Sequence, residues 1–195
     1  SLIENPKNKE AKFYSLYYEE KIEECFEFLK ENKLNIEIVQ KFLNSIWYKE
    51  EFLDDSQKLK ERYNLTSEQS DLYYYVQKKD YKWLYKYFNN NEQRKSDSTY
   101  IDYGKVCFEY KKYDEAINYY NNKEIKTYKD YFVLGECYEK QGIKEKATEY
   151  YKAYYIESPL DAWGKGFEKL FDLEEYDLIE SILKIKKSGV DKEDT

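Results

Sequence analysis

The chain has 195 residues, a formal net charge of −7 and no histidine. This length suits one ordinary domain or a short repeat array. The lack of histidine excludes Ser-His-Asp and Cys-His nucleophiles and every zinc site that uses histidine. The negative net charge gives the chain no overall electrostatic attraction for nucleic acid or for an anionic membrane.

Charged residues make up 37% of the chain and are spread throughout it, so no run of about 20 apolar residues predicts a membrane span. The three cysteines, Cys25, Cys107 and Cys137, form no CxxC pair and are too few for a four-cysteine zinc site. We expect them to be small core residues in a reducing, cytoplasmic setting. We expect no metal and no cofactor. The lack of any methionine indicates a processed chain or a fragment of a larger protein.

The spacing of apolar residues predicts helices throughout. Only two prolines and six glycines interrupt the chain, which favours helices joined by short loops over a sheet. The tyrosine runs at 73–75 and 119–120 resemble strands in composition. They lie beside Lys/Glu-rich segments with a 3.6-residue period, so we predict helix there too.

The first 64 residues predict helices with little repetition. One apolar stripe contains Phe13, Leu16 and Tyr17, and an out-of-phase stripe contains Ile22, Cys25, Phe26 and Leu29. The change of phase predicts a helix break between them. A third stripe predicts a helix over 36–53. We interpret residues 1–64 as divergent repeats or as a helical cap, which an open array of repeats needs at its end.

From residue 65 onward the sequence repeats itself. Leu84, Ala116, Ala147 and Ile179 are spaced by 32, 31 and 32 residues. Gly104 and Gly135 each precede one of these alanines by 12 residues. A fixed period of this length is typical of stacked helix pairs, in which small residues mark close helix contacts.

These residues carry a resemblance to the tetratricopeptide repeat family. Residues 128–161 match best, through Tyr131, Leu134, Gly135, Tyr138, Ala147, Tyr151 and Pro159. Residues 97–127 match less well. Residues 160–187 have Trp163 at the tryptophan position of the pattern but Phe167 where glycine is usual. Residues 65–96 match only in their second helix. The resemblance implies an all-α, right-handed α-solenoid of antiparallel helix pairs. It would have about four repeats over 65–187. The low hydrophobicity of residues 188–195 predicts a disordered tail.

Several residues predict helix ends. Thr127 is a candidate N-cap, and Thr66 with Gln69 has the spacing of a capping box. Gly142 suits the turn inside the best repeat. Pro159 predicts a helix end and Asp161 a following cap.

The resemblance also implies a binding groove along the first helices of the repeats. The positions expected to face it are Tyr73, Val76, Ile101, Lys105, Phe108, Phe132, Glu136, Glu139, Glu168 and Phe171. Apolar and charged residues mix there, which indicates an extended peptide or a helix as ligand. Three glutamates against one lysine favour some positive charge on it, unless the glutamates are merely solvated.

We therefore predict a non-catalytic scaffold that binds a protein or peptide partner, with self-association also open. One alternative is an accessory domain of a larger bacterial enzyme such as a glycosyltransferase. Another is a peptide-sensing regulatory receptor, although residues 1–64 contain no convincing DNA-reading helix. Most paired carboxylates, such as Glu19-Glu20, lie among lysines, as in solvated helix faces, so a standalone enzyme is disfavoured.

Overall fold

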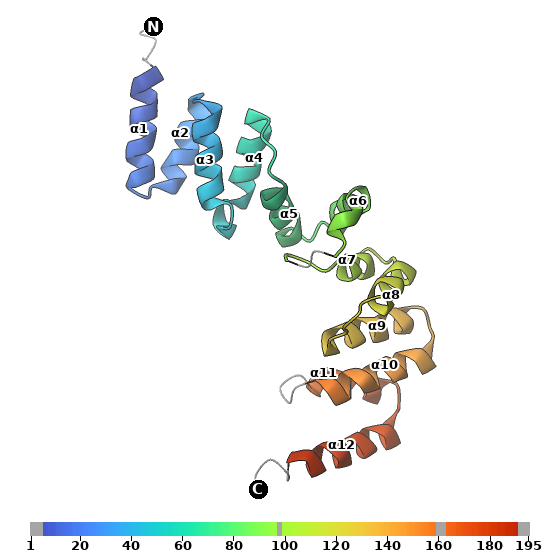
Figure 1. The fold of residues 1–195 in the computed structure, drawn as a ribbon. Coiled ribbons are helices and arrows are strands. Elements are labelled where there is room, and N and C mark those ends of the chain that lie inside the picture. The colour runs from blue at the N-terminus through green and yellow to red at the C-terminus, as the bar shows by residue number, and fades with distance from the viewer. Residues whose placement is uncertain (1–5, 97–98, 159–162, 191–195) are drawn as a thin grey trace. The chain divides into compact units, whose positions relative to one another are not determined.

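The structure is a computed structural model that describes residues 6–96, 99–158 and 163–190 (Figure 1). Every regular element within those ranges is a helix, with 12 α-helices and two short 3-10 helices. The predicted all-α class is confirmed for this part of the chain, including the tyrosine runs at 73–75 and 119–120. No helix in the described ranges combines the length and apolar character needed to cross a membrane.

Contacts divide the chain into two units, residues 1–80 and 81–195. Unit 1 contains α1 (Pro6–Tyr18), α2 (Ile22–Glu31), α3 (Ile36–Ile46), η1 (Glu50–Phe52), α4 (Leu53–Tyr63) and α5 (Glu68–Gln77). Unit 2 contains α6 (Tyr81–Asn90), η2 (Glu92–Arg94), α7 (Tyr103–Glu109), α8 (Tyr113–Asn121), α9 (Tyr128–Lys140), α10 (Lys144–Glu157), α11 (Trp163–Asp172) and α12 (Tyr176–Val190). Helix α5, which the repeat frame assigns to the first repeat, thus belongs to unit 1.

The helices of unit 1 follow its apolar stripes. The predicted break separates α1 from α2, and Glu20 takes a left-handed conformation (φ 58°) in the turn. The single helix predicted over 36–53 is wrong, because α3 ends at Ile46 and α4 begins only at Leu53. Between them the sequence supplies Glu50 and Glu51, which contribute nothing to a buried stripe.

Large side chains fill the core of unit 1. The ring of Phe42 lies 5.4 Å from that of Phe13 and 5.2 Å from that of Phe26, both in edge-to-face contact. Leu29 and Val39 are fully buried beside them. These helices are therefore held mainly by apolar burial, which stabilises by roughly 1.5–3 kcal/mol for each large side chain.

Polar contacts fasten the later helices of unit 1. The ammonium of Lys60 on α4 is almost completely buried and pairs with Asp71 on α5. Arg62 donates to the carbonyl oxygens of Leu29 (2.6 Å) and Lys30 (2.5 Å), so it caps the end of α2. Helix α5 buries no residue completely, and the Lys60–Asp71 pair is one of the contacts that hold it to α4.

In unit 2 the helices pack in chain order, each against the next from α6 to α12. The repeated positions Leu84, Ala116, Ala147 and Ile179 lie on α6, α8, α10 and α12, and all four are buried. The predicted repeat frame thus coincides with the second helices. This arrangement is consistent with a helical repeat.

Two glycines allow close helix contacts in unit 2. A Cβ atom on Gly104 would lie 2.5 Å from a ring carbon of Tyr120, and one on Gly135 would lie 2.5 Å from a ring carbon of Tyr151. No side chain fits at that distance, so glycine permits α7 to approach α8 and α9 to approach α10. Gly166, one residue before the Phe167 position where the repeat pattern has glycine, also packs tightly, but against Tyr154 of the preceding α10.

The predicted helix ends have mixed outcomes. Thr127 and Asp130 form a complete capping box at the start of α9, and Gly142 takes a positive φ of 76° in the turn before α10. The cap predicted at Thr66 is wrong, since α5 begins one residue later with Ser67 as its N-cap. Pro159 and Asp161 lie outside the described residues. Helix α12 runs to Val190, and residues 191–195 of the expected tail also lie outside them.

Candidate functional site

A cavity of about 580 Å³ lies in unit 2 along the first helices of successive pairs. Helices α7, α9 and α11 contribute its walls, and α10 contributes one ring. The lining residues are Lys105, Tyr128, Lys129, Phe132, Val133, Glu136, Tyr154, Gly164, Lys165 and Glu168. Its volume is within the range of about 300–1,000 Å³ typical of ligand pockets.

Four predicted groove residues meet at this cavity: Lys105, Phe132, Glu136 and Glu168. Lys105, Glu136 and Glu168 come from three consecutive first helices, with spacings of 31 and 32 residues. Stacking of similar helices therefore brings one position of each repeat to a common surface.

The apolar wall of the cavity, formed by Phe132 and Tyr154, is fixed by the packing of α9 on α10. The capping box of Thr127 and Asp130 fixes the start of α9, and Gly135 lets this helix lie directly on Tyr151. The Phe132 ring then lies 5.7 Å from the Tyr151 ring and 4.9 Å from the Tyr154 ring. Phe132 is only half-buried by these contacts, so one part of its ring is left to line the cavity.

Gly164 leaves room at the start of α11. A Cβ atom built on it would meet no heavy atom within 4 Å, unlike one built on Gly166 two residues later. The residue is exposed and lines the cavity. The lack of a side chain at this one position is therefore part of what keeps the cavity open.

Two of the charged groups near the cavity are already paired. Lys105 makes an ion pair with Glu109 (2.9 Å), and Lys169 makes one with Glu139 (2.9 Å). Glu139 also accepts a hydrogen bond from the Tyr151 hydroxyl. Burial opposes the ionisation of Glu139, but the bonds from Tyr151 and Lys169 outweigh it and lower the pKa of this carboxyl.

Glu136 differs from Glu139. It is half-buried, and within the described parts of the chain no group donates a hydrogen bond to it. Burial raises the pKa of Glu136, against the attraction of Lys105 and Lys169. Glu168 lines the same cavity from α11 and is exposed. These two carboxylates line the cavity and form no ion pair within the described residues.

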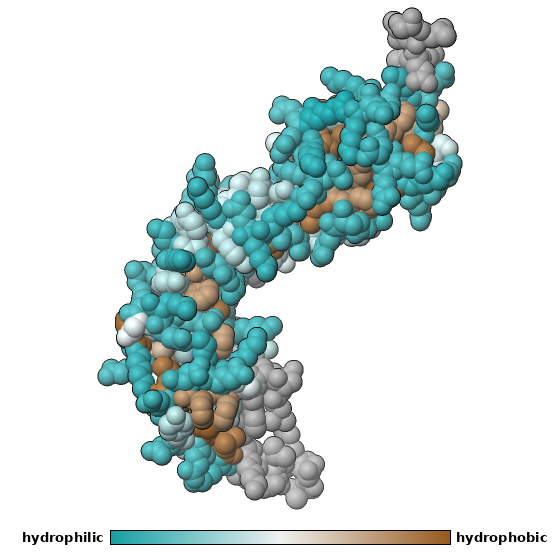
Figure 2. Space-filling view, turned by 180° about the vertical axis from the view of Figure 1, so that it is seen from behind, coloured by the Kyte–Doolittle hydropathy of each residue, from teal (hydrophilic) through white to brown (hydrophobic). Residues whose placement is uncertain are grey.

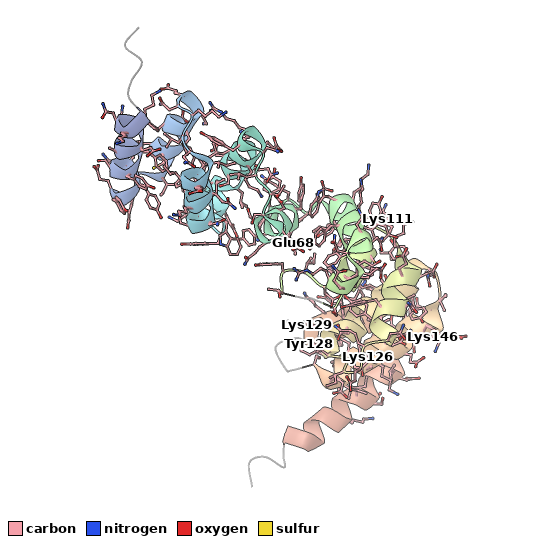
Figure 3. The ribbon with its side chains drawn as sticks, turned by 45° about the horizontal axis from the view of Figure 1, so that its top comes forward. Glu68, Lys111, Lys126, Tyr128, Lys129 and Lys146 are labelled. Carbon is pink, nitrogen blue, oxygen red and sulfur yellow. The ribbon has the colours of Figure 1, made fainter. Side chains whose placement is uncertain are left out.

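Basic and aromatic groups also line the cavity. Tyr128 and Lys129 occupy the first turn of α9, with the Lys129 ammonium 5.8 Å from the centre of the Tyr128 ring (Figure 3). Lys165 stands in the first turn of α11. Lys129 and Lys165 are exposed. The expected balance of three glutamates against one lysine therefore does not describe this cavity, which adds two lysines and has Glu139 already paired.

The other predicted groove residues lie elsewhere. Tyr73 and Val76 belong to α5 in unit 1, where Tyr73 packs its ring 5.3 Å from that of Trp47. Ile101 precedes α7, and Phe108 lies under the Lys105 ammonium (5.0 Å) at the end of that helix. Phe171 is half exposed, in contact with the rings of Phe167 and Tyr176.

The cavity includes residues that repeat spacing missed. Tyr154 was missed because it comes from a second helix, and Lys165 because the repeat frame assigned it no groove position. The signal for Gly164 was available: a glycine at a helical position that needs no close contact leaves space.

A larger cavity of about 870 Å³, lined mainly by polar and charged residues, lies between η2, α7 and α8. Several of these side chains are already hydrogen-bonded, in part to residues beyond the lining. Tyr85 and Tyr103 donate to Glu115 (2.6 and 3.0 Å), and Lys123 donates to Asp102 and Asp130. These groups satisfy each other without a ligand, so this cavity is the weaker candidate.

The three cysteines are buried, as expected. Burial raises the pKa of the Cys25 and Cys107 thiols to about 11 and that of Cys137 to about 12. Thiols with such values are poor nucleophiles at neutral pH. In the described ranges no group of three or more Cys, Asp or Glu side chains is placed to hold a metal ion.

Comparison with family models, curated proteins and solved structures finds no match to this chain. The resemblance to tetratricopeptide repeats thus rests on the residues described above.

Proposed function

We propose that this chain is a non-catalytic protein-interaction scaffold that binds a peptide or helix of a partner protein. Its fold would be a right-handed solenoid of antiparallel helix pairs of the tetratricopeptide kind. The observation that carries this proposal is the cavity in unit 2, where equivalent positions of α7, α9 and α11 meet beside a fixed aromatic wall. The surface in Figure 2 is mostly hydrophilic with separate hydrophobic patches, which favours local docking over broad apolar association.

The chemistry of the cavity suits binding rather than turnover. Phe132 and Tyr154 offer apolar surface that is already ordered, so a ligand side chain gains burial without reorganising the wall. The charged groups around them orient the ligand. The buried thiols have raised pKa values and do not supply a nucleophile.

A display library of random short peptides, selected on the full chain, tests this function. Gly164→Phe fills the cavity at a position with free space, so it is expected to keep the fold and abolish the enrichment of binders. Lys152→Phe places the same ring on the exposed face of α10, away from the cavity lining, and is expected to leave enrichment unchanged. Circular dichroism checks that both variants are folded.

Two results would overturn the proposal. One is that no peptide is enriched on the folded wild-type chain. The other is that the enriched peptides bind Gly164→Phe as well as they bind wild type, because they would then occupy another surface.

A further inference from the structure

The unpaired carboxylates of the cavity indicate the charge of the segment that binds there. Glu136 on α9 and Glu168 on α11 face the same cavity from neighbouring first helices. Glu136 is half-buried and receives no hydrogen bond within the described residues. A carboxylate that is partly removed from water is stabilised by a donor or a cation. A ligand that brings a cation would satisfy this group.

The neighbouring lysines do not take this role. Lys105 is held by Glu109 at 2.9 Å, and Lys169 is held by Glu139 at 2.9 Å. Each lysine attracts Glu136 through space, but each has a closer carboxylate partner. The local charge that remains uncompensated around the middle of α9 is therefore negative.

In the described residues neither Lys129 nor Lys165 forms an ion pair with Glu136 or Glu168, although Lys165 stands three positions before Glu168 on α11. Seven residues separate Lys129 from Glu136, which is about 10 Å along a helix. Both lysines are exposed, and water and salt screen such charges strongly. These two lysines therefore select only weakly for an acidic group on the ligand.

An apolar recess adjoins the carboxylates. Gly164 offers no side chain at the cavity, and the rings of Phe132 and Tyr154, whose centres lie 4.9 Å apart, line it. The recess can take one large aliphatic or aromatic side chain, whose burial favours binding. Apolar and acidic surfaces thus lie next to each other in one cavity.

From this juxtaposition, and resting on the proposed function, we infer that the cavity selects a protein segment in which a large apolar residue stands beside an arginine or lysine. The apolar side chain enters the recess opened by Gly164, and the cation bridges Glu136 and Glu168. Arginine fits better than lysine, because its planar guanidinium donates to two carboxylates at once. An acidic residue at the same place meets like charge and is rejected.

Four sets of short synthetic peptides with capped ends test this selectivity. Their centres are Leu-Arg, Leu-Gln, Leu-Glu and Ser-Arg, in otherwise identical mixed flanks, and affinity for the full chain is measured by calorimetry. The Leu-Arg set is expected to bind at least about tenfold tighter than the Leu-Gln and Ser-Arg sets. The Leu-Glu set is expected to bind weakest.

Variants tie the selectivity to the two carboxylates. Glu136→Gln is expected to remove most of the preference for Leu-Arg over Leu-Gln, and Glu136→Lys to shift the preference toward Leu-Glu. Glu145→Gln changes an exposed carboxylate of α10 outside the cavity lining and is expected to have no effect.

The outcomes separate this inference from the proposed function. If all four sets bind equally, or the Leu-Glu set binds best, the inference is wrong while peptide binding stands. If no set binds and the random library also yields no binder, both are wrong. If Leu-Arg is preferred but Glu136→Gln and Glu136→Lys keep that preference, another surface selects the cation and the inference is wrong.

Discussion

Unit 1 fills its core with large side chains, whereas unit 2 sets a glycine of one helix against a tyrosine of the next. In unit 1 the rings of Phe13, Phe26 and Phe42 interlock with fully buried aliphatic residues. In unit 2 the contacts of Gly104 with Tyr120 and of Gly135 with Tyr151 bring helix backbones close. The packing of unit 1 depends on large side chains that fill its core. The close helix contacts of unit 2 depend on glycines that have no side chain.

The two units also use buried polar groups differently. Lys60 of unit 1 is a buried cation whose partner Asp71 anchors a helix with no fully buried residue. In unit 2 the tyrosine hydroxyls reach carboxylates at the edge of the core, as Tyr151 reaches Glu139. Removing a large or charged side chain should therefore weaken unit 1, whereas adding a side chain at a glycine should weaken unit 2.

The largest effect is expected from Phe42→Ala. Removing this ring leaves a cavity among Phe13, Phe26 and Leu29, which costs about 3–5 kcal/mol in the free energy of unfolding. Hydrogen exchange followed by mass spectrometry measures where protection is lost. Amides of residues 1–80 are expected to exchange much faster, and those of residues 81–195 far less so. An equal loss in both units would show that they unfold as one block.

Asp71→Asn comes next. It leaves the buried Lys60 ammonium without its anionic partner, and breaking a buried pair in this way costs about 3 kcal/mol. Lys60→Met is expected to cost much less, because Asp71 is more exposed than Lys60 and can be hydrated. Denaturant unfolding of both variants measures the difference. Equal costs would contradict the view that the stranded lysine is the main penalty.

Gly135→Ala follows, with an expected loss of about 1–3 kcal/mol. The new methyl group would lie 2.5 Å from the Tyr151 ring, which is buried and fixed by its hydrogen bond to Glu139. Thermal unfolding measures the loss. Tyr151→Leu should make room for the methyl group, so the double variant is expected to lose less than the sum of the two single ones.

The same substitution at two other glycines provides the controls. Gly142→Ala meets no atom within 4 Å but must adopt a φ of 76°, which costs about 1 kcal/mol. Gly164→Ala has free space, and alanine favours a helix over glycine by up to about 1 kcal/mol. A destabilised Gly164→Ala variant would show that the cavity beside it is not open.

These glycines also show what the sequence could and could not predict. The frame of unit 2 was predictable because each close helix contact needs a small residue, which leaves Gly104, Gly135, Ala116 and Ala147 at fixed spacing. Unit 1 has no such constraint, since large apolar residues can interlock in many registers. Its stripes therefore predicted the break after α1 but not the end of α3 at Ile46.

The cavity was predictable to the extent that it follows the repeat. Lys105, Glu136 and Glu168 occupy one repeated position and do meet. Which carboxylate is free was not predictable, because it depends on pairings between helices: Lys169 on α11 engages Glu139 and leaves Glu136. Periodicity places a residue on a face, but it does not say which neighbour from another repeat reaches it.

The smallest effect, below about 1 kcal/mol, is expected from Glu136→Gln in the absence of ligand. Burial raises the pKa of Glu136 in the folded chain above its ordinary value, with Lys105 and Lys169 opposing the shift and Glu139 and Glu109 adding to it. The unfolded chain therefore releases this proton first, and the stability of wild type falls as the pH rises through the interval between the two pKa values.

Glu136→Gln cannot ionise and avoids this loss. It is expected to melt slightly higher than wild type at pH 7, with the difference vanishing below the ordinary pKa of glutamate. Thermal unfolding of both proteins across that pH range measures the difference, with Glu145→Gln as an exposed control. If Glu136→Gln is instead less stable at pH 7, the carboxylate already has a favourable partner in the free protein, and a ligand cation would add little to it.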